Sequence, residues 1–142
     1  MDVIVNYDSP SPLREVDEAW FTLASRFGLF AEDGTFLLLV NLLDDVDDID
    51  LRWARVRLNQ EWTVAGDNPA TINGPGKRGL CTMSAVGDVV IVGTTYEEYM
   101  SVLAVPDPHR ASAIKHHAEG LLRSGNLSAG EAENVKRWLE RT

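Results

Sequence analysis

Apolar residues recur at helical spacing in the first third of the chain, in the set Leu13, Val16, Trp20, Leu23, Ala24 and Phe27. Ser11 can cap this segment, and Pro12 suits the first helical position, where a missing N–H loses no hydrogen bond. Gly28 follows at the place where a left-handed residue ends many helices. The pattern predicts a helix over residues 12–27.

Two further helices are expected at the C-terminal end of the chain. Asp107–Pro108 opens the first, and Gly125 ends it. Ser128 and Glu131 form a capping box for the second. The apolar stripes of the two helices are Ala111, Ile114, Ala118, Leu121 and Leu122 in the first, and Ala132, Val135, Trp138 and Leu139 in the second.

A second capping box, Thr95 with Glu98, predicts another helix ahead of this pair. An apolar face follows it at i, i+3, i+4 and i+7, formed by Tyr96, Tyr99, Met100 and Leu103. We therefore expect residues 1–105 to end in a helix.

Two apolar segments predict strands. Residues 2–7 form a short one, and residues 36–43 are apolar on both faces apart from Asn41. A strand covered on both faces is typical of a parallel sheet. We expect Val3–Val5 and Phe36–Val40 to be adjacent parallel strands, joined by a right-handed crossover through the first helix.

A hairpin is expected within the apolar segment 80–93, because Gly87-Asp88 is a two-residue turn signal. Counting outward from the turn pairs Met83 with Val92 and puts Cys81 on the same face, which we take as the core side. Free cysteine is among the most buried residue types. We expect the Cys81 thiol to be structural and slow to react.

The segment 44–65 allows three interpretations. Ala54, Val56 and Leu58 alternate with polar residues, which predicts a long strand over residues 51–65. Apolar residues from 39 to 56 also follow a spacing that suits one long helix, although a run of aspartates is poor helix interior. The third interpretation is a shorter helix that starts after the aspartates.

We favour the third, a helix capped by Asp47 that extends to Trp62, with an apolar stripe formed by Leu51, Ala54, Leu58 and Trp62. Asp50 then lies in its first turn, where a negative charge is favourable, and Asp48 precedes Arg52 by four residues. With the alternative strand, the fold class would instead be α+β, with the long strand in an antiparallel sheet.

Composition and charge narrow the class of protein. With 44% apolar and 25% charged residues, the chain should fold on its own. A net charge of −9 argues against nucleic-acid or anionic-membrane partners and is compatible with a basic protein partner. A homo-oligomer is left open. One cysteine excludes a disulfide framework and an all-cysteine metal site. Neither a signal peptide nor a membrane-length apolar run is present, so we expect a cytoplasmic protein.

Candidate binding residues gather around the acidic run. Asp44, Asp45, Asp47 and Asp48 offer carboxylates to a basic partner, while their spacing lacks the glycine of a calcium loop. We expect replacement of Asp44, Asp45 and Asp47 by asparagine to slow association with such a partner. Trp53 falls outside the apolar stripe of the favoured helix and is nominated as a surface anchor.

Other chemistry has weaker support. Lys77 and Arg78 lie in the Gly-, Pro- and Asn-rich loop 66–79 and offer cations to a phosphorylated ligand, but no serine or threonine follows the lysine as in a Walker A loop. The three histidines, His109, His116 and His117, lack the spacing of metal ligands on one helix. No Gly-x-Ser-x-Gly nucleophile motif is present.

Residues 3–13 and 87–99 resemble two parts of the thioredoxin-like family. The first segment resembles its strand, proline turn and helix start, and the second its last hairpin and closing helix. No cysteine lies between Tyr7 and Val16, and Gly79 stands where the family places a cis-proline. The family's thiol–disulfide exchange is therefore not implied for any residue here.

The resemblance implies an α/β fold. Its core would be thioredoxin-like, βαβαββα over residues 1–105, with a mixed sheet and helices on both faces. Residues 106–142 would form a C-terminal helical extension packed on the same domain.

The sequence favours a non-catalytic protein-binding domain without thiol redox activity, such as an adaptor, inhibitor, immunity factor or assembly subunit. No cofactor or metal is implied. One alternative is a small enzyme or ligand-binding domain that uses loop 66–79 for a phosphorylated ligand. Another is a structural subunit of a larger assembly, including a viral one. Fold alone does not decide between them.

Overall fold

The computed structural model describes residues 1–41, 51–60, 62–65 and 79–140. Contacts divide the chain into two units, Met1–Pro106 and Asp107–Thr142. No helix in the described ranges is long and apolar enough to cross a membrane.

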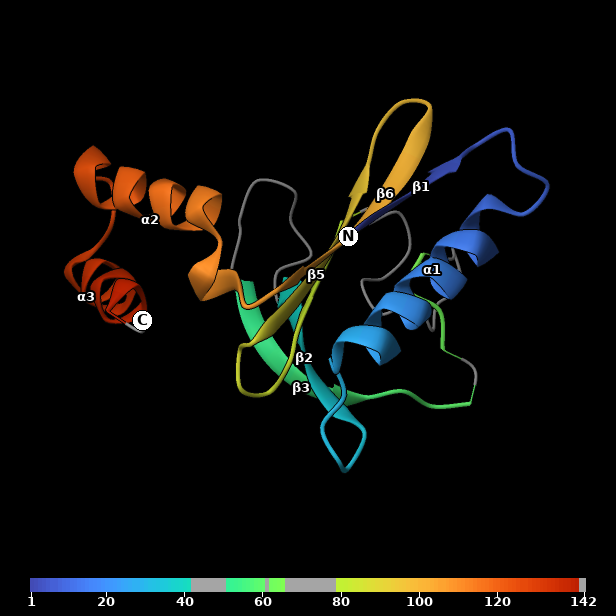
Figure 1. Cartoon of the computed structure of the whole chain (residues 1–142), viewed down its shortest axis with the longest axis horizontal. Helices are drawn as coiled ribbons and strands as arrows, with labels where there is room; N and C mark the ends of the chain where they lie inside the picture. Colours follow the sequence, from blue (N-terminus) through green and yellow to red (C-terminus); the bar gives the residue numbers. More distant parts are fainter. Residues whose placement is uncertain (42–50, 61, 66–78, 141–142) are drawn as a thin grey trace. The chain divides into compact units, whose positions relative to one another are not determined.

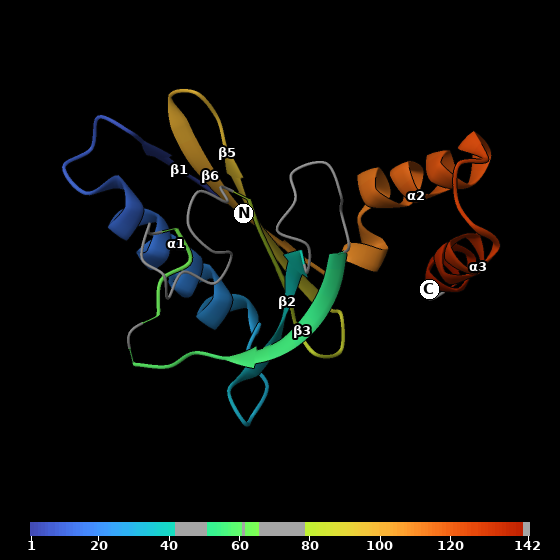
Figure 2. The same cartoon turned by 180° about the vertical axis from the view of Figure 1, so that it is seen from behind.

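The first unit is a six-stranded sheet with a helix against one face (Figures 1 and 2). Its strands are β1 (Asp2–Asn6), β2 (Thr35–Asn41), β3 (Leu51–Arg57), β4 (Leu80–Met83), β5 (Val89–Thr95) and β6 (Tyr99–Pro106). They lie in the order β1-β6-β5-β4-β2-β3, and each neighbouring pair is antiparallel. The chain therefore combines helices with a sheet, as expected, but the sheet is antiparallel.

The predicted first helix is confirmed as α1 (Pro12–Phe27). Gly28 ends it with φ 74°, a left-handed conformation that glycine adopts without strain, and donates its N–H to the Ala24 carbonyl. The expected Ser11 side-chain cap is absent. Instead, the Ser9 hydroxyl donates to the Glu15 carboxylate in the first turn.

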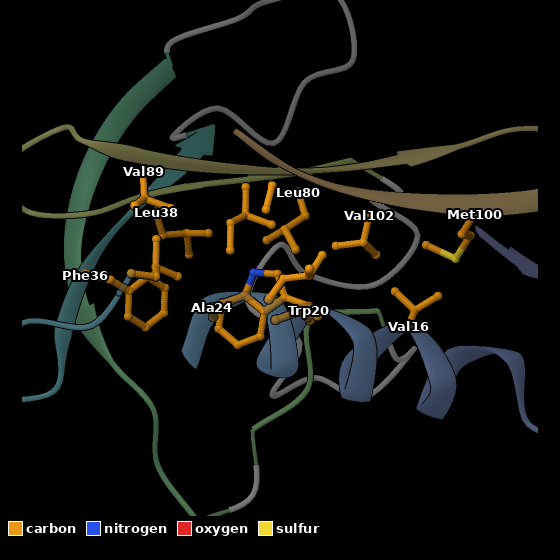
Figure 3. Close-up of a cluster of buried hydrophobic side chains, with 14 of the residues drawn as sticks. Val16, Trp20, Ala24, Phe36, Leu38, Leu80, Val89, Met100 and Val102 are labelled. Carbon is orange, nitrogen blue, oxygen red and sulfur yellow. The ribbon is translucent and has the colours of Figure 1, made fainter. Parts of the chain in front are cut away.

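The core lies between α1 and the sheet. Figure 3 shows Val16, Trp20 and Ala24 of α1 facing buried side chains of the sheet. Trp20 is fully buried, and its indole N–H donates to the Thr82 hydroxyl at 3.2 Å. Its ring lies 5.5 to 6.0 Å from three further aromatic rings, those of Phe30, Phe36 and Trp62. One amphipathic helix thus closes the inner face.

The favoured helix from Asp47 to Trp62 is wrong. Residues 51–57 form β3, which pairs with β2 along its whole length. Ala54 and Val56 are half-buried, while the arginines that alternate with them are exposed. The alternation of apolar and polar residues therefore predicted this segment correctly as a strand. Pairing with β2 stabilises the strand more than the local capping residues stabilise a helix. The strand ends at Arg57, short of the expected residue 65.

The expected helix after Thr95 is also wrong. Tyr96 to Glu98 form the turn between β5 and β6, where the Tyr96 N–H donates to the Tyr99 carbonyl at 2.9 Å. The inward residues of β6 alternate, with Met100, Val102 and Ala104 buried. A period of two therefore prevails over the apparent helical spacing.

The first and second strands are not adjacent. Among the described strands, β1 pairs with β6 alone and lies at one edge, whereas β2 lies between β4 and β3. Both pairings of β2 are antiparallel, so the predicted parallel crossover is wrong. Within the described part of the first unit, α1 is the sole helix, and helices on both faces are not observed there.

The β4–β5 register differs by two residues from the expected one. Met83 lies opposite Val90 rather than Val92. The turn is longer than two residues, because the Ser84 N–H donates to the Val89 carbonyl and the Ser84 hydroxyl accepts the Val89 N–H. Cys81 is half-buried on the face opposite Leu80, so its predicted position on the core side is wrong.

The Cys81 thiol should still react slowly. Burial raises its pKa, and only the thiolate is the nucleophile. We expect native protein to be alkylated by iodoacetamide more slowly than unfolded protein at mildly alkaline pH, and the native rate to rise at higher pH than the unfolded rate. Native labelling as fast as in denaturant would contradict this.

The second unit contains a short 3-10 turn, η1 (Pro108–Arg110), and two helices, α2 (Ser112–Ser124) and α3 (Ala129–Leu139). Both predicted helices are present, but α2 begins at Ser112 and not at the predicted Asp107–Pro108, where the 3-10 turn lies instead. Gly125 ends α2 with φ 70°, and Ser128 and Glu131 form both hydrogen bonds of the predicted capping box. Packing of this pair on the first 105 residues stays a prediction.

Candidate functional site

Strand β3 is an edge of the sheet. One side of it pairs with β2 from Asn41↔Leu51 to Thr35↔Arg57. No strand among the residues described pairs with its other side. An edge strand of this kind can pair through its backbone N–H and C=O groups with another extended chain.

Two large apolar side chains project from this edge strand. Leu51 is 53% exposed and Trp53 is 44% exposed. They lie two residues apart and therefore on the same face, where Leu39 of β2 is the cross-strand neighbour of Trp53. Exposed tryptophan is enriched among residues that dominate binding energy. We call Leu51, Trp53 and the side of β3 away from β2 the edge surface.

The apolar character continues from the edge surface across the sheet. Register places the following half-buried or exposed residues on this outer face, opposite α1: Leu37, Leu39, Cys81, Met83, Val90, Val92, Leu103 and Val105. Both faces of the sheet are therefore apolar. This explains why residues 36–40 read as a strand covered on both sides.

Charged groups flank one end of the edge surface. Arg55 lies two residues from Trp53, and its Nε donates to the Thr35 hydroxyl at 3.1 Å. The Thr35 N–H and hydroxyl both donate to the Asp33 carboxylate. These hydrogen bonds, together with the nearby charges of Arg55 and Arg57, hold the pKa of the Asp33 carboxyl below its usual value. Arg55 and Arg57 therefore lie close to Asp33, just before the first residue of β2.

The second unit has an apolar surface of its own. An open groove of about 340 Å³ lies between α2 and α3. Ile114, Leu121, Val135 and Trp138 line it, together with His117. No residue of α3 is fully buried within the structure. A helical pair this short seldom provides a sufficient core alone, so the groove is a second candidate contact surface.

Of the binding residues nominated from the sequence, Trp53 alone lies within the described residues. It is exposed on β3, as a surface anchor requires. Asp44, Asp45, Asp47 and Asp48 lie outside the described residues, as do Lys77 and Arg78 of loop 66–79. Among the residues that are described, no group of three His, Cys, Asp or Glu side chains could hold a metal ion.

Sequence reasoning missed Leu51 and the exposed side of the α2–α3 pair. In the favoured helix, Leu51 belonged to the buried stripe, whereas in a strand it shares a face with Trp53. The strand alternation therefore contained the signal. Leu121 and Trp138 were assigned to buried stripes, yet Leu121 is 37% exposed.

Comparisons with protein families, with characterised proteins and with solved structures find no match to this chain.

Proposed function

We propose that this chain is a non-catalytic protein-binding domain, without thiol redox activity, that binds its partner along the edge surface. The observation that carries the proposal is the pair of exposed side chains, Leu51 and Trp53, on an edge strand whose outer side has no strand partner among the described residues. Main-chain pairing would supply affinity, and the tryptophan would supply specificity.

The chemistry of the partner is indicated by the sequence that precedes β3. Asp50 is bonded to Leu51, and Asp44, Asp45, Asp47 and Asp48 stand just before it. A partner segment with basic residues near the Leu51 end of the strand would complement these charges. Adaptor, inhibitor, immunity factor and assembly subunit are all roles of this kind. The thioredoxin-like resemblance supplies no part of the proposal, because its redox residues are missing.

A substitution at Trp53 tests the proposal. In Trp53→Ser, loss of the anchor should weaken binding to the partner purified from the native source by about 30-fold or more, since hot-spot truncation costs about 2 kcal/mol. Thermal stability should change little, because the side chain is nearly half exposed. Affinity is measured by titration calorimetry with both purified proteins.

Val86→Ser is the matched control. Val86 lies in the β4–β5 turn and is 77% exposed, so this change also removes an exposed apolar side chain. We expect its affinity to equal that of the wild type. Equal affinity of Trp53→Ser and Val86→Ser for the partner would exclude the edge surface.

A further inference from the structure

A cavity of about 280 Å³ lies on the inner side of the β2–β3 hairpin. Its apolar walls are formed by Phe36, Leu38, Val40, Val56, Leu58 and Trp62. The edge surface is on the opposite face of the same strands, because Trp53 and Val56 have opposite parity along β3. The cavity is therefore a site separate from the proposed partner contact.

The Trp62 wall is fixed in place by α1. Asp17 of α1 accepts hydrogen bonds from the Thr63 hydroxyl at 2.6 Å, the Val64 N–H at 2.7 Å and the Ala65 N–H at 3.0 Å. The Trp62 ring stacks on Phe21 with centroids 5.4 Å apart. These contacts hold the segment next to the cavity in one position before any ligand binds, which reduces the ordering cost of binding.

The facing wall is part of the sheet. Val40 and Val56 are half-buried and can contact a ligand, whereas Phe36 and Leu38 are 0% and 3% exposed and cannot. Aliphatic and aromatic carbon atoms form this wall, which suits an apolar ligand. Ligand pockets commonly measure about 300 to 1,000 Å³. This cavity, at about 280 Å³, lies just below that range and suits a small molecule.

The polar residues described in the lining are Arg57 and Asn59. Arg57, the last residue of β3, has the parity of Trp53, and it also lines an adjoining cavity with Phe21 and Phe30. A guanidinium binds a carboxylate through two parallel hydrogen bonds and remains charged at all physiological pH values. The lining contains no described acidic residue to attract a cation.

We propose that this cavity binds a small apolar monocarboxylate, with its hydrocarbon part between Trp62 and the half-buried Val40 and Val56 and its carboxylate at Arg57. The positive charge at the rim selects the anionic head, and the apolar walls select the chain. This goes beyond the proposed partner binding and does not depend on it.

The test uses three probes of equal chain length, namely octanoate, octanol and octylamine, titrated into the full-length protein by calorimetry. We expect saturable binding of octanoate, at least tenfold weaker binding of octanol, and none of octylamine. Arg57→Gln should weaken octanoate binding at least tenfold. Arg55→Gln, two residues along the strand and outside the lining, is the matched control and should bind octanoate as the wild type does.

A second, independent test fills the cavity with a larger side chain. Val56→Trp should abolish octanoate binding. If that variant does not fold, Leu58→Phe, a smaller change, replaces it and should weaken octanoate binding. Absence of saturable octanoate binding to the wild type would overturn the proposal, as would equal binding of octylamine or unchanged binding in Arg57→Gln. Trp53→Ser should bind octanoate normally, which separates this site from the edge surface.

Discussion

Leu38→Asp is expected to lower the melting temperature of the domain by at least about 10 °C. Leu38 is 3% exposed, and its neighbours across the sheet are Ala54 and Thr82. An unpaired buried charge costs about 3 to 5 kcal/mol, against a total stability of about 5 to 15 kcal/mol for a typical domain. Thermal melting followed by circular dichroism measures the effect.

Leu103→Asp is the control for this substitution. Leu103 lies in the same sheet, on the outer face, and is 39% exposed. A charge there keeps contact with water, so we expect a melting temperature within a few degrees of the wild type. If Leu38→Asp retained a melt that close to the wild type, the packing of β2 between β3 and β4 with Leu38 in the core would be wrong.

Trp20→Ala is the second large effect, with an expected loss of about 3 to 5 kcal/mol in the free energy of unfolding. The side chain is completely buried among other aromatic rings, and its removal leaves a cavity that the rigid sheet cannot close. The Thr82 hydroxyl also loses the indole donor and keeps its own bond to the Ile91 carbonyl. Denaturant unfolding gives the magnitude.

Trp53→Ala provides the comparison within one residue type. This substitution also removes a tryptophan side chain, but from an exposed position. We expect it to change the free energy of unfolding by less than about 1 kcal/mol. Comparable losses for Trp20→Ala and Trp53→Ala would show that α1 does not close the core in the way the structure places it.

Local signals predicted the helices well where several of them agreed. At α1, the apolar period, the proline at the first position and Gly28 all indicate the same limits, and the structure confirms them. At α3, the capping box of Ser128 and Glu131 is formed as expected. These features depend on residues close together in the chain, so the sequence alone specifies them.

Strand pairing depends on distant residues and was harder to predict. The Asp47–Asp50 pattern and the Thr95–Glu98 pair are both plausible helix starts. Pairing with β2 nevertheless makes a strand of residues 51–57, and pairing with β5 makes a strand of residues 99–106. Local propensity yields to such tertiary contacts. The apolar outer face had a further effect, because it made β2 resemble a strand of a parallel sheet.

The candidate site was predictable only in part. Trp53 was nominated because it did not fit a buried stripe, and it is exposed on β3. Leu51 was missed, because its exposure depends on β3 being the last strand of the sheet. The cavity beside Trp62 was not predictable, since its walls come from β2, β3 and the segment that Asp17 ties to α1.

Hydrogen exchange of the β3 backbone, measured with and without the purified partner, tests the central claim most directly. If the partner pairs with the edge surface, amides of Leu51–Arg57 that do not bond to β2 should gain strong protection on binding, whereas amides of α1 should not change. Binding that leaves the exchange of every β3 amide unaltered would contradict the account.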